Sequence, residues 1–108
     1  MIELSKIVLL SKVKFSLGII GMMFRKKKLI PHVFKKRGFF TVNSMHGWFM
    51  SYPIDIIFLN DKNIVVDKAC FGPFGGYTSK VKGIVYAVEA MEGDFDEIEL
   101  GDTVLWNG

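Results

Sequence analysis

A single hairpin signal constrains the fold of this chain more than any other feature of its 108 residues. Ile54–Leu59 is a β-branched and aromatic run containing one carboxylate, Asp55, which is typical of a buried strand and too short for a stable helix. Pro53 has no backbone N–H to give to a sheet, so we place it at the first position of the strand. Asn63 tolerates the left-handed conformation that a short hairpin loop needs, and the chain returns over Ile64–Lys68. The sequence therefore predicts a central β-hairpin.

The remaining elements are short. Ile7–Leu10 is a continuous apolar run, which predicts a first strand buried on both faces. Ser16–Met23 has apolar residues at helical spacing and predicts a short helix, while Asp94–Glu97 has capping-box spacing and predicts a helical turn. Thr103–Trp106 follows a Gly-Asp turn and predicts the closing strand. About seven short strands with one or two short helices predict a mainly β fold, a small sandwich or barrel-like single domain over residues 1–108.

Composition limits the class of protein. Half of the residues are hydrophobic and 14% are aromatic, so the chain can build a core. The longest uncharged run near the N-terminus, Phe15–Phe24, is about half of the ~20 residues that a bilayer requires, and Arg25–Lys28 follows where a secretion signal would have its cleavage site. A single cysteine excludes an internal disulfide. We therefore expect no membrane insertion and a cytoplasmic location.

The net charge of +3 hides an asymmetry between the two parts of the sequence. Residues 1–43 carry ten Lys or Arg and one Glu, whereas residues 44–108 carry four Lys and ten Asp or Glu. The basic residues, such as Arg25–Lys28 and Lys35–Arg37, could form a surface for nucleic acid, could meet the acidic segment of another copy, or could be solvated in separate turns. We rank the solvated turns first and nucleic acid last, because isolated surface charges are the commonest case.

Candidate site residues gather just before and within the central strand. His46 and Asp55 flank Pro53 and could form an acid–base pair, in which a carboxylate orients an imidazole. The alternative, which we favour, is that Asp55 binds backbone amides and His46 packs among aromatic residues. Trp48, Phe49 and Tyr52 could stack on a base or sugar, or could lie in the core or a subunit interface. The sequence thus names His46, Trp48, Tyr52 and Asp55 as candidate ligand-binding residues.

No cofactor or metal site is predicted. His32, His46 and Cys70 lack the spacing of metal ligands. Cys70 has no third group that would make it a nucleophile with either histidine, so we expect a buried, inert thiol. The glycine-rich loop at 72–76 lacks the Gly-Lys-Ser/Thr ending of a phosphate-binding loop.

Three stretches carry a family resemblance. Gly21–Arg25 resembles a Gly-Leu-Met-Phe-Arg motif, and Pro53–Leu59 resembles a Pro-(Leu/Ile)-Asp-(Ile/Val)-x-Phe-(Ile/Leu) signature. Val88–Glu89, Gly93 and Gly101–Asp102 are similar to the C-terminal pattern of the same family, the domain-of-unknown-function 192 family, also called uncharacterised protein family 0127. The resemblance runs from about Phe15 to the C-terminus. It implies a small, mainly β fold and no activity, because none is established for the family.

The sequence departs from the commoner bacterial form of that family before Pro53. The bacterial form has Phe-Trp-Met-Lys-Asn there, whereas this chain has Met45-His46-Gly47-Trp48-Phe49. The Lys-Asn pair is absent, and a Ser-(Ile/Met)-His sequence is more typical of archaeal relatives.

These observations predict a non-catalytic binding or interaction module with an aromatic-lined cleft near His46 to Asp55. An enzyme that uses His46 and Asp55, or a nucleic-acid binder with a basic face, is the alternative. A homo-oligomer or a protein partner is compatible with either reading.

Overall fold

The computed structural model describes residues 5–10, 13–15, 31–36, 42–46, 53–72 and 75–106. The strands in these residues, in chain order, are β1 (Ile7–Leu10), β2 (Lys14–Phe15), β3 (His32–Lys35), β4 (Ser44–His46), β5 (Ile54–Leu59), β6 (Val65–Phe71), β7 (Gly76–Thr78), β8 (Tyr86–Met91) and β9 (Thr103–Trp106). The mainly β fold class is therefore confirmed.

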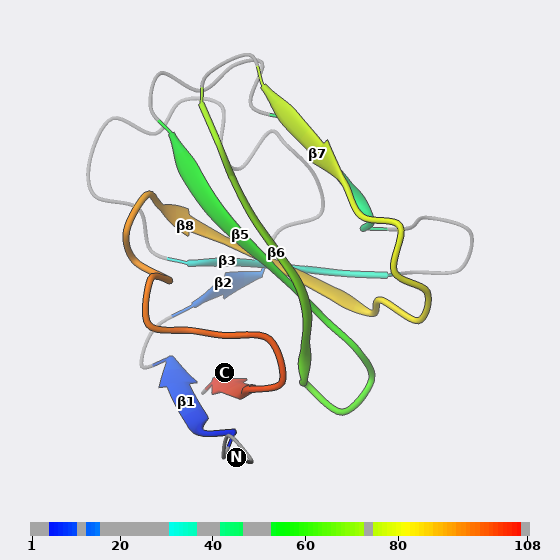
Figure 1. Ribbon diagram of the computed structural model, residues 1–108, viewed down its shortest axis with the longest axis vertical. Helices are drawn as coiled ribbons and strands as arrows, with labels where there is room; N and C mark the ends of the chain where they lie inside the picture. The colour runs from blue at the N-terminus through cyan, green and yellow to red at the C-terminus, as the bar shows by residue number, and fades with distance from the viewer. Residues whose placement is uncertain are drawn as a thin grey trace, which may run out of the picture.

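Five strands form the central sheet in the order β2–β3–β8–β5–β6. Its neighbouring strands are antiparallel except for β2 and β3, which run parallel. Two further sheets have two strands each: β4 pairs antiparallel with β7, and β1 pairs parallel with β9 (Figure 1). The strand β5 lies between β8 and β6, which explains why all of its side chains are buried.

The predicted hairpin is confirmed. The strand β5 begins directly after Pro53 and pairs antiparallel with β6. Asn63 has a φ of 62°, the left-handed conformation expected for it. The Asn60 side-chain oxygen accepts hydrogen bonds from the backbone N–H groups of Lys62 (2.9 Å) and Ile64 (3.0 Å), which closes the loop.

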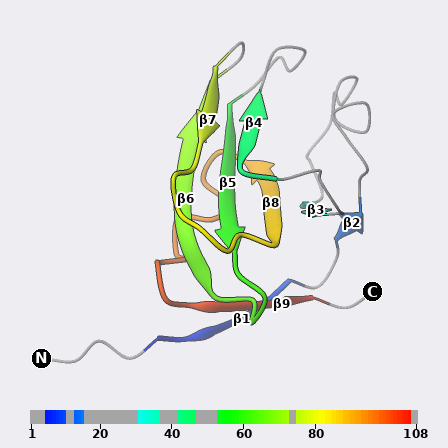
Figure 2. The ribbon, with the colours of Figure 1, turned by 90° about the vertical axis from the view of Figure 1, so that its right-hand side faces the viewer.

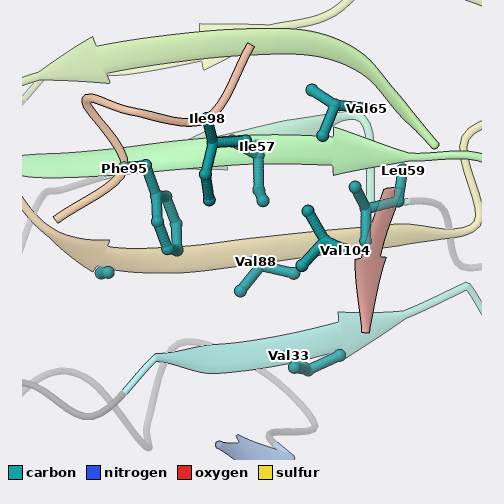
Figure 3. Packing of buried hydrophobic residues seen from close by; sticks show 9 residues of the cluster. Val33, Ile57, Leu59, Val65, Val88, Phe95, Ile98 and Val104 are labelled. Carbon is teal, nitrogen blue, oxygen red and sulfur yellow. The ribbon is translucent and has the colours of Figure 1, made fainter. Parts of the chain in front are cut away.

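The two faces of the central sheet are covered by different parts of the chain. On one face, Ile56 and Phe58 of β5 belong to a core cluster that includes Val42 and is packed by Tyr77, so β4 and β7 lie over this side; we call it the β4–β7 face. On the other face, Ile57 packs with Phe95 and Val104, and we call this the β9 face. Figure 3 shows this second cluster, in which the chain between β8 and β9 supplies the covering side chains.

The β4–β7 pair is tethered to the central sheet by one carboxylate. Oδ2 of Asp67 in β6 accepts hydrogen bonds from the Tyr77 hydroxyl (2.8 Å) and from the Ser79 hydroxyl (2.5 Å). Burial opposes ionisation of Asp67, but the hydrogen bonds from Ser79 and Tyr77 outweigh it and hold the pKa of this carboxyl below its usual value. The Tyr77 ring also lies 5.8 Å from that of Phe58, centroid to centroid. Polar and aromatic contacts together fix β7 over the sheet.

Two sequence expectations are wrong in this part of the chain. The strand β1 is not buried on both faces: its side chains alternate between exposed and half-buried, because it pairs only with β9 among the described residues. The helical turn expected at Asp94–Glu97 is instead a series of turns, with hydrogen bonds from Asp94 N to Met91 O (3.0 Å) and from Asp96 N to Gly93 O (3.2 Å). The capping carboxylate comes from elsewhere in the chain, as described below.

The helix predicted over Ser16–Met23 lies outside the described residues. Within the described residues, none belongs to a helix, and no helix long and apolar enough to cross a membrane is found among them.

Candidate functional site

The structure places the two ends of the predicted site on different elements. His46 is the last residue of β4 and pairs with Gly76 of β7. Asp55 is the second residue of β5 and is buried, with 3% of its surface exposed. Trp48 and Tyr52 lie outside the described residues, and only the backbone of His46 is described.

Asp55 holds the turn that follows β8. Its Oδ2 accepts hydrogen bonds from the backbone N–H groups of Gly93 (3.1 Å) and Phe95 (3.2 Å). These amides open the run of turns that the sequence assigned to a helix capped by Asp94. A buried carboxylate that accepts two amide hydrogen bonds is well satisfied where it is, since charged acceptors form the stronger hydrogen bonds. The favoured reading of Asp55, as a ligand for backbone amides, agrees with this geometry.

Lys68 also binds the turn that follows β8. Its Nζ donates hydrogen bonds to the backbone carbonyls of Phe95 (2.7 Å) and Ile98 (2.8 Å). Lys68 pairs with Ile57 in register, and Asp55 pairs with Cys70, so the two charged side chains are diagonal neighbours on β5 and β6. We call this pair the Asp55–Lys68 clamp: the carboxylate takes the amides of the turn, and the ammonium takes its carbonyls.

The central sheet separates Asp55 from β4. Ala90, the register partner of Asp55 on β8, packs on the β9 face, as does Phe95. The pairing of β4 with β7 lies on the opposite face, where Tyr77 packs (Figure 2). The side chain of His46 is not described, so the acid–base pair of His46 and Asp55 stays a prediction.

A buried pair on the β4–β7 face was missed by the sequence analysis. Glu89 of β8 and His32 of β3 are direct register partners, with 2% and 1% of their surfaces exposed. The other register partner of Glu89 is Ile56, which packs on the β4–β7 face, so both members of the pair belong to this side. Side chains in such pairs have Cβ atoms about 5 Å apart.

Glu89 is the most perturbed carboxyl of the described chain. Burial raises its pKa to about 8, which leaves it mostly uncharged at neutral pH. The available sequence signal is a single carboxylate inside the apolar strand Tyr86–Met91, which is also part of the family pattern.

Cys70 lies beside two carboxylates. It is exposed rather than buried as expected, and its Sγ donates a hydrogen bond to Glu92 Oε2 at 3.4 Å. Partial desolvation of the thiol and hydrogen bonds to Asp55 and Glu92 raise the pKa of Cys70 to about 12. The thiol therefore stays protonated at neutral pH and is a poor nucleophile, as the sequence suggested.

A metal centre is not found in the part of the chain that the structure describes, where no group of three possible ligands occurs. Of the basic residues, Lys35 and Lys36 are exposed, and Lys35 Nζ lies 5.9 Å from the centroid of the Tyr86 ring. Arg25–Lys28 and Arg37 are outside the described ranges, so a basic surface stays a prediction.

Three curated proteins from Pyrococcus species are similar to this chain. A UPF0127 protein of Pyrococcus furiosus is 36% identical over 91 residues, which cover 82% of this chain and 77% of the relative. UPF0127 proteins of Pyrococcus horikoshii (34% identical, covering 81% of this chain and 76% of the relative) and Pyrococcus abyssi (37% identical, covering 58% and 55%) are also similar. No family model and no solved structure matches the chain.

Proposed function

Since this chain belongs to uncharacterised protein family 0127, whose name records no activity, we propose from its geometry that it is a non-catalytic binding module. In this proposal the ligand binds on the β4–β7 face at the buried carboxyl of Glu89, and Trp48 and Tyr52 are the aromatic residues that contact it. As part of the same proposal, the single cysteine favours a reducing, cytoplasmic setting.

The observation that carries this proposal is the state of Glu89. Burial raises the pKa of Glu89 to about 8, and groups perturbed in this way are found more often at functional sites than elsewhere. A ligand that donates a hydrogen bond or a positive charge to Glu89 would stabilise its ionised form. We therefore propose that the ligand carries an ammonium or another cationic N–H group.

The described residues on either side of the aromatic segment support the same face. Residues 47–52 connect His46, which ends β4, to Pro53, which precedes Ile54. The strand β4 belongs to the covering layer of the β4–β7 face, and Ile54 packs into its cluster beside Met91. Trp48 and Tyr52 suit a cationic ligand by their chemistry, since the ring faces of Trp and Tyr attract positive charge.

The contacts of Asp55 support a binding module over an enzyme. Its carboxylate is buried and accepts two backbone amides, which leaves it a positioning role for the turn after β8. In this proposal Asp55 therefore positions the turn after β8 from the β9 face and does not contact the ligand. His46, Trp48 and Tyr52 contact the ligand.

A titration followed by two-dimensional ¹H–¹⁵N NMR tests the proposal with phenethylammonium as the probe and phenethyl alcohol as its neutral match. We expect the ammonium to shift the resonances of His32, Glu89 and the Trp48 indole, and the alcohol to bind at least tenfold more weakly. Glu89→Gln should abolish the difference between the probes. Glu97→Gln, at an exposed glutamate of the turn, should preserve it.

Two results would contradict the proposal. One is the absence of any shift with either probe at millimolar concentration. The other is equal binding of the two probes by the unmodified protein, because Glu89 would then contribute nothing to recognition.

A further inference from the structure

Exposed apolar side chains are concentrated in one region of the molecule. The large hydrophobic side chains that are exposed among the described residues are Ile7 (72%), Leu9 (61%), Leu100 (63%) and Leu105 (42%). They lie on β1, on β9 or in the turn directly before β9, although the described chain extends over nine strands. Both ribbon views place β1 and β9 at one end of the molecule (Figures 1 and 2).

Three of these side chains share one face of the β1–β9 sheet. In the parallel register Ile7 lies opposite Thr103, and Leu9 lies opposite Leu105. The alternate residues of both strands, which include Val8 and Val104, pack into the core of the β9 face. We call the surface formed by Ile7, Leu9, Thr103 and Leu105 the outer β1–β9 face.

The apolar area of this surface is close to what a small specific dimer requires. Together, the exposed fractions of Ile7, Leu9 and Leu105 leave an apolar patch on the order of 300 Å², the size at which surface patches are often functional. Two copies facing each other would bury roughly 600 Å² of apolar surface. A specific interface of about 1,200 Å² in total contains nearly this much, since somewhat more than half of such an interface is non-polar.

The charges beside this surface suit a second copy of the same chain. Lys6 precedes β1 and forms an ion pair with Asp102, with 2.7 Å between Nζ and Oδ2. Glu97 and Glu99 are exposed and close enough to Lys6 to act on its charge. A twofold interface uses one surface twice and must complement itself, so a rim that carries both signs of charge meets this requirement.

We propose that the outer β1–β9 face docks a second copy of this chain, with the two small sheets packed face to face about a twofold axis near Leu9. Stacked sheets lie about 10 Å apart, which lets the side chains of Ile7, Leu9 and Leu105 from each copy interdigitate. Lys6 of each copy then lies at the rim, opposite the acidic turn of the other.

Sedimentation velocity over a range of protein concentration, with light scattering for the mass, tests this directly. We expect the unmodified protein to be dimeric at ~10 μM, and Leu9→Lys to weaken the dimer at least tenfold because it places a charge at the centre of the apolar contact. Thr78→Lys is the matched control: Thr78 is exposed on β7, and its change should leave the dimer intact. Circular dichroism confirms that each variant is folded.

Cross-linking gives an independent measurement. In a Cys70→Ser background, Leu9→Cys should be joined between copies by a short bismaleimide, whereas Thr78→Cys should not. A protein that is monomeric at ~100 μM overturns the proposal, and so does a dimer that Leu9→Lys leaves unchanged. A dimer that dissociates in ~0.5 M NaCl but survives Leu9→Lys would instead show that the basic and acidic segments hold the copies together.

Discussion

Replacement of Glu89 by glutamine should change how the stability of this protein depends on pH. In the unfolded chain this carboxyl has a pKa near 4.5, and in the folded protein burial raises it to about 8. Between these values the folded protein retains a proton that the unfolded chain has lost. Folding stability is therefore highest below pH 4.5 with respect to this group, and it falls as the pH rises towards 8.

The slope follows from linkage. One retained proton lowers the free energy of unfolding by about 1.4 kcal/mol for each pH unit within this window. Over the whole window, from 4.5 to about 8, the loss is on the order of 5 kcal/mol. This is a large part of the 5–15 kcal/mol that stabilises a typical domain.

Urea denaturation at pH 5, 6, 7 and 8, followed by tryptophan fluorescence, measures the effect. Glutamine cannot ionise, so Glu89→Gln should remove most of the decline between pH 5 and 8. The slope is the informative quantity, because a buried amide has its own cost at every pH. The control Glu97→Gln, on the exposed turn, should retain the slope of the unmodified protein.

The carboxyl of Asp102 titrates outside this window. Hydrogen bonds from Lys6 and from the Glu99 amide lower the pKa of Asp102 to about 2, so its contribution is lost only in stronger acid. If the unmodified protein and Glu89→Gln declined in parallel, Glu89 would already be ionised in the folded state. Both its burial as an uncharged acid and the argument for a cationic ligand would then be refuted.

Two further predictions concern the clamp and the thiol. Asp55→Ala should lower the free energy of unfolding by about 2–4 kcal/mol, because it leaves the Gly93 and Phe95 amides without their acceptor. The control Asp61→Ala, in the exposed hairpin loop, should lower it by less than ~0.5 kcal/mol. Urea denaturation measures both variants, and equal losses would contradict the clamp. In the folded protein at pH 8, Cys70 should react with Ellman's reagent about a thousandfold more slowly than in concentrated urea, because a pKa of about 12 leaves a thiolate fraction near 10⁻⁴. Glu92→Gln should partly restore the rate, since it removes one of the carboxylates beside the thiol. A fast reaction of the folded protein would refute the raised pKa of Cys70.

The sequence predicts the hairpin because its signals are local. Ile54–Leu59 has a strand composition, Pro53 marks its beginning, and the loop chemistry of Asn60 and Asn63 depends on residues within four positions of each other. Each signal can be read from neighbouring residues, and the structure confirms each of them.

The turn after β8 shows why other predictions fail. Asp94 and Glu97 have the spacing of a capping box, but the amides in this segment are taken by Asp55, about forty residues earlier in the chain. A tertiary contact of this kind leaves no signal in the local sequence. The prediction that Ile7–Leu10 is buried on both faces is wrong for a related reason. All four residues are aliphatic, so the sequence does not indicate that only alternate side chains reach the core.

The contacts of Asp55 with backbone amides were predicted from the sequence, whereas its role in a ligand site stays a prediction. Asp55 was identified as important and its contacts with backbone amides were the favoured reading, because a lone carboxylate in a buried strand needs partners. Glu89 satisfies the same description within Tyr86–Met91, yet its pairing with His32 depends on the strand order of the sheet, which joins β3 to β8.

The pairing of β1 with β9 has a consequence for the order in which the molecule assembles. The hydrogen bonds between Lys6 and Asp102 join residues 96 positions apart, the longest-range side-chain contact described in the chain. Such pairing has a high contact order. The entropy cost of closing this long loop is smaller once the central sheet has formed and has brought β9 into place. We therefore expect β1 to dock last and to detach first, with weak protection from hydrogen exchange. On this order of assembly, the apolar surface that β1 completes forms only after the rest of the chain has folded.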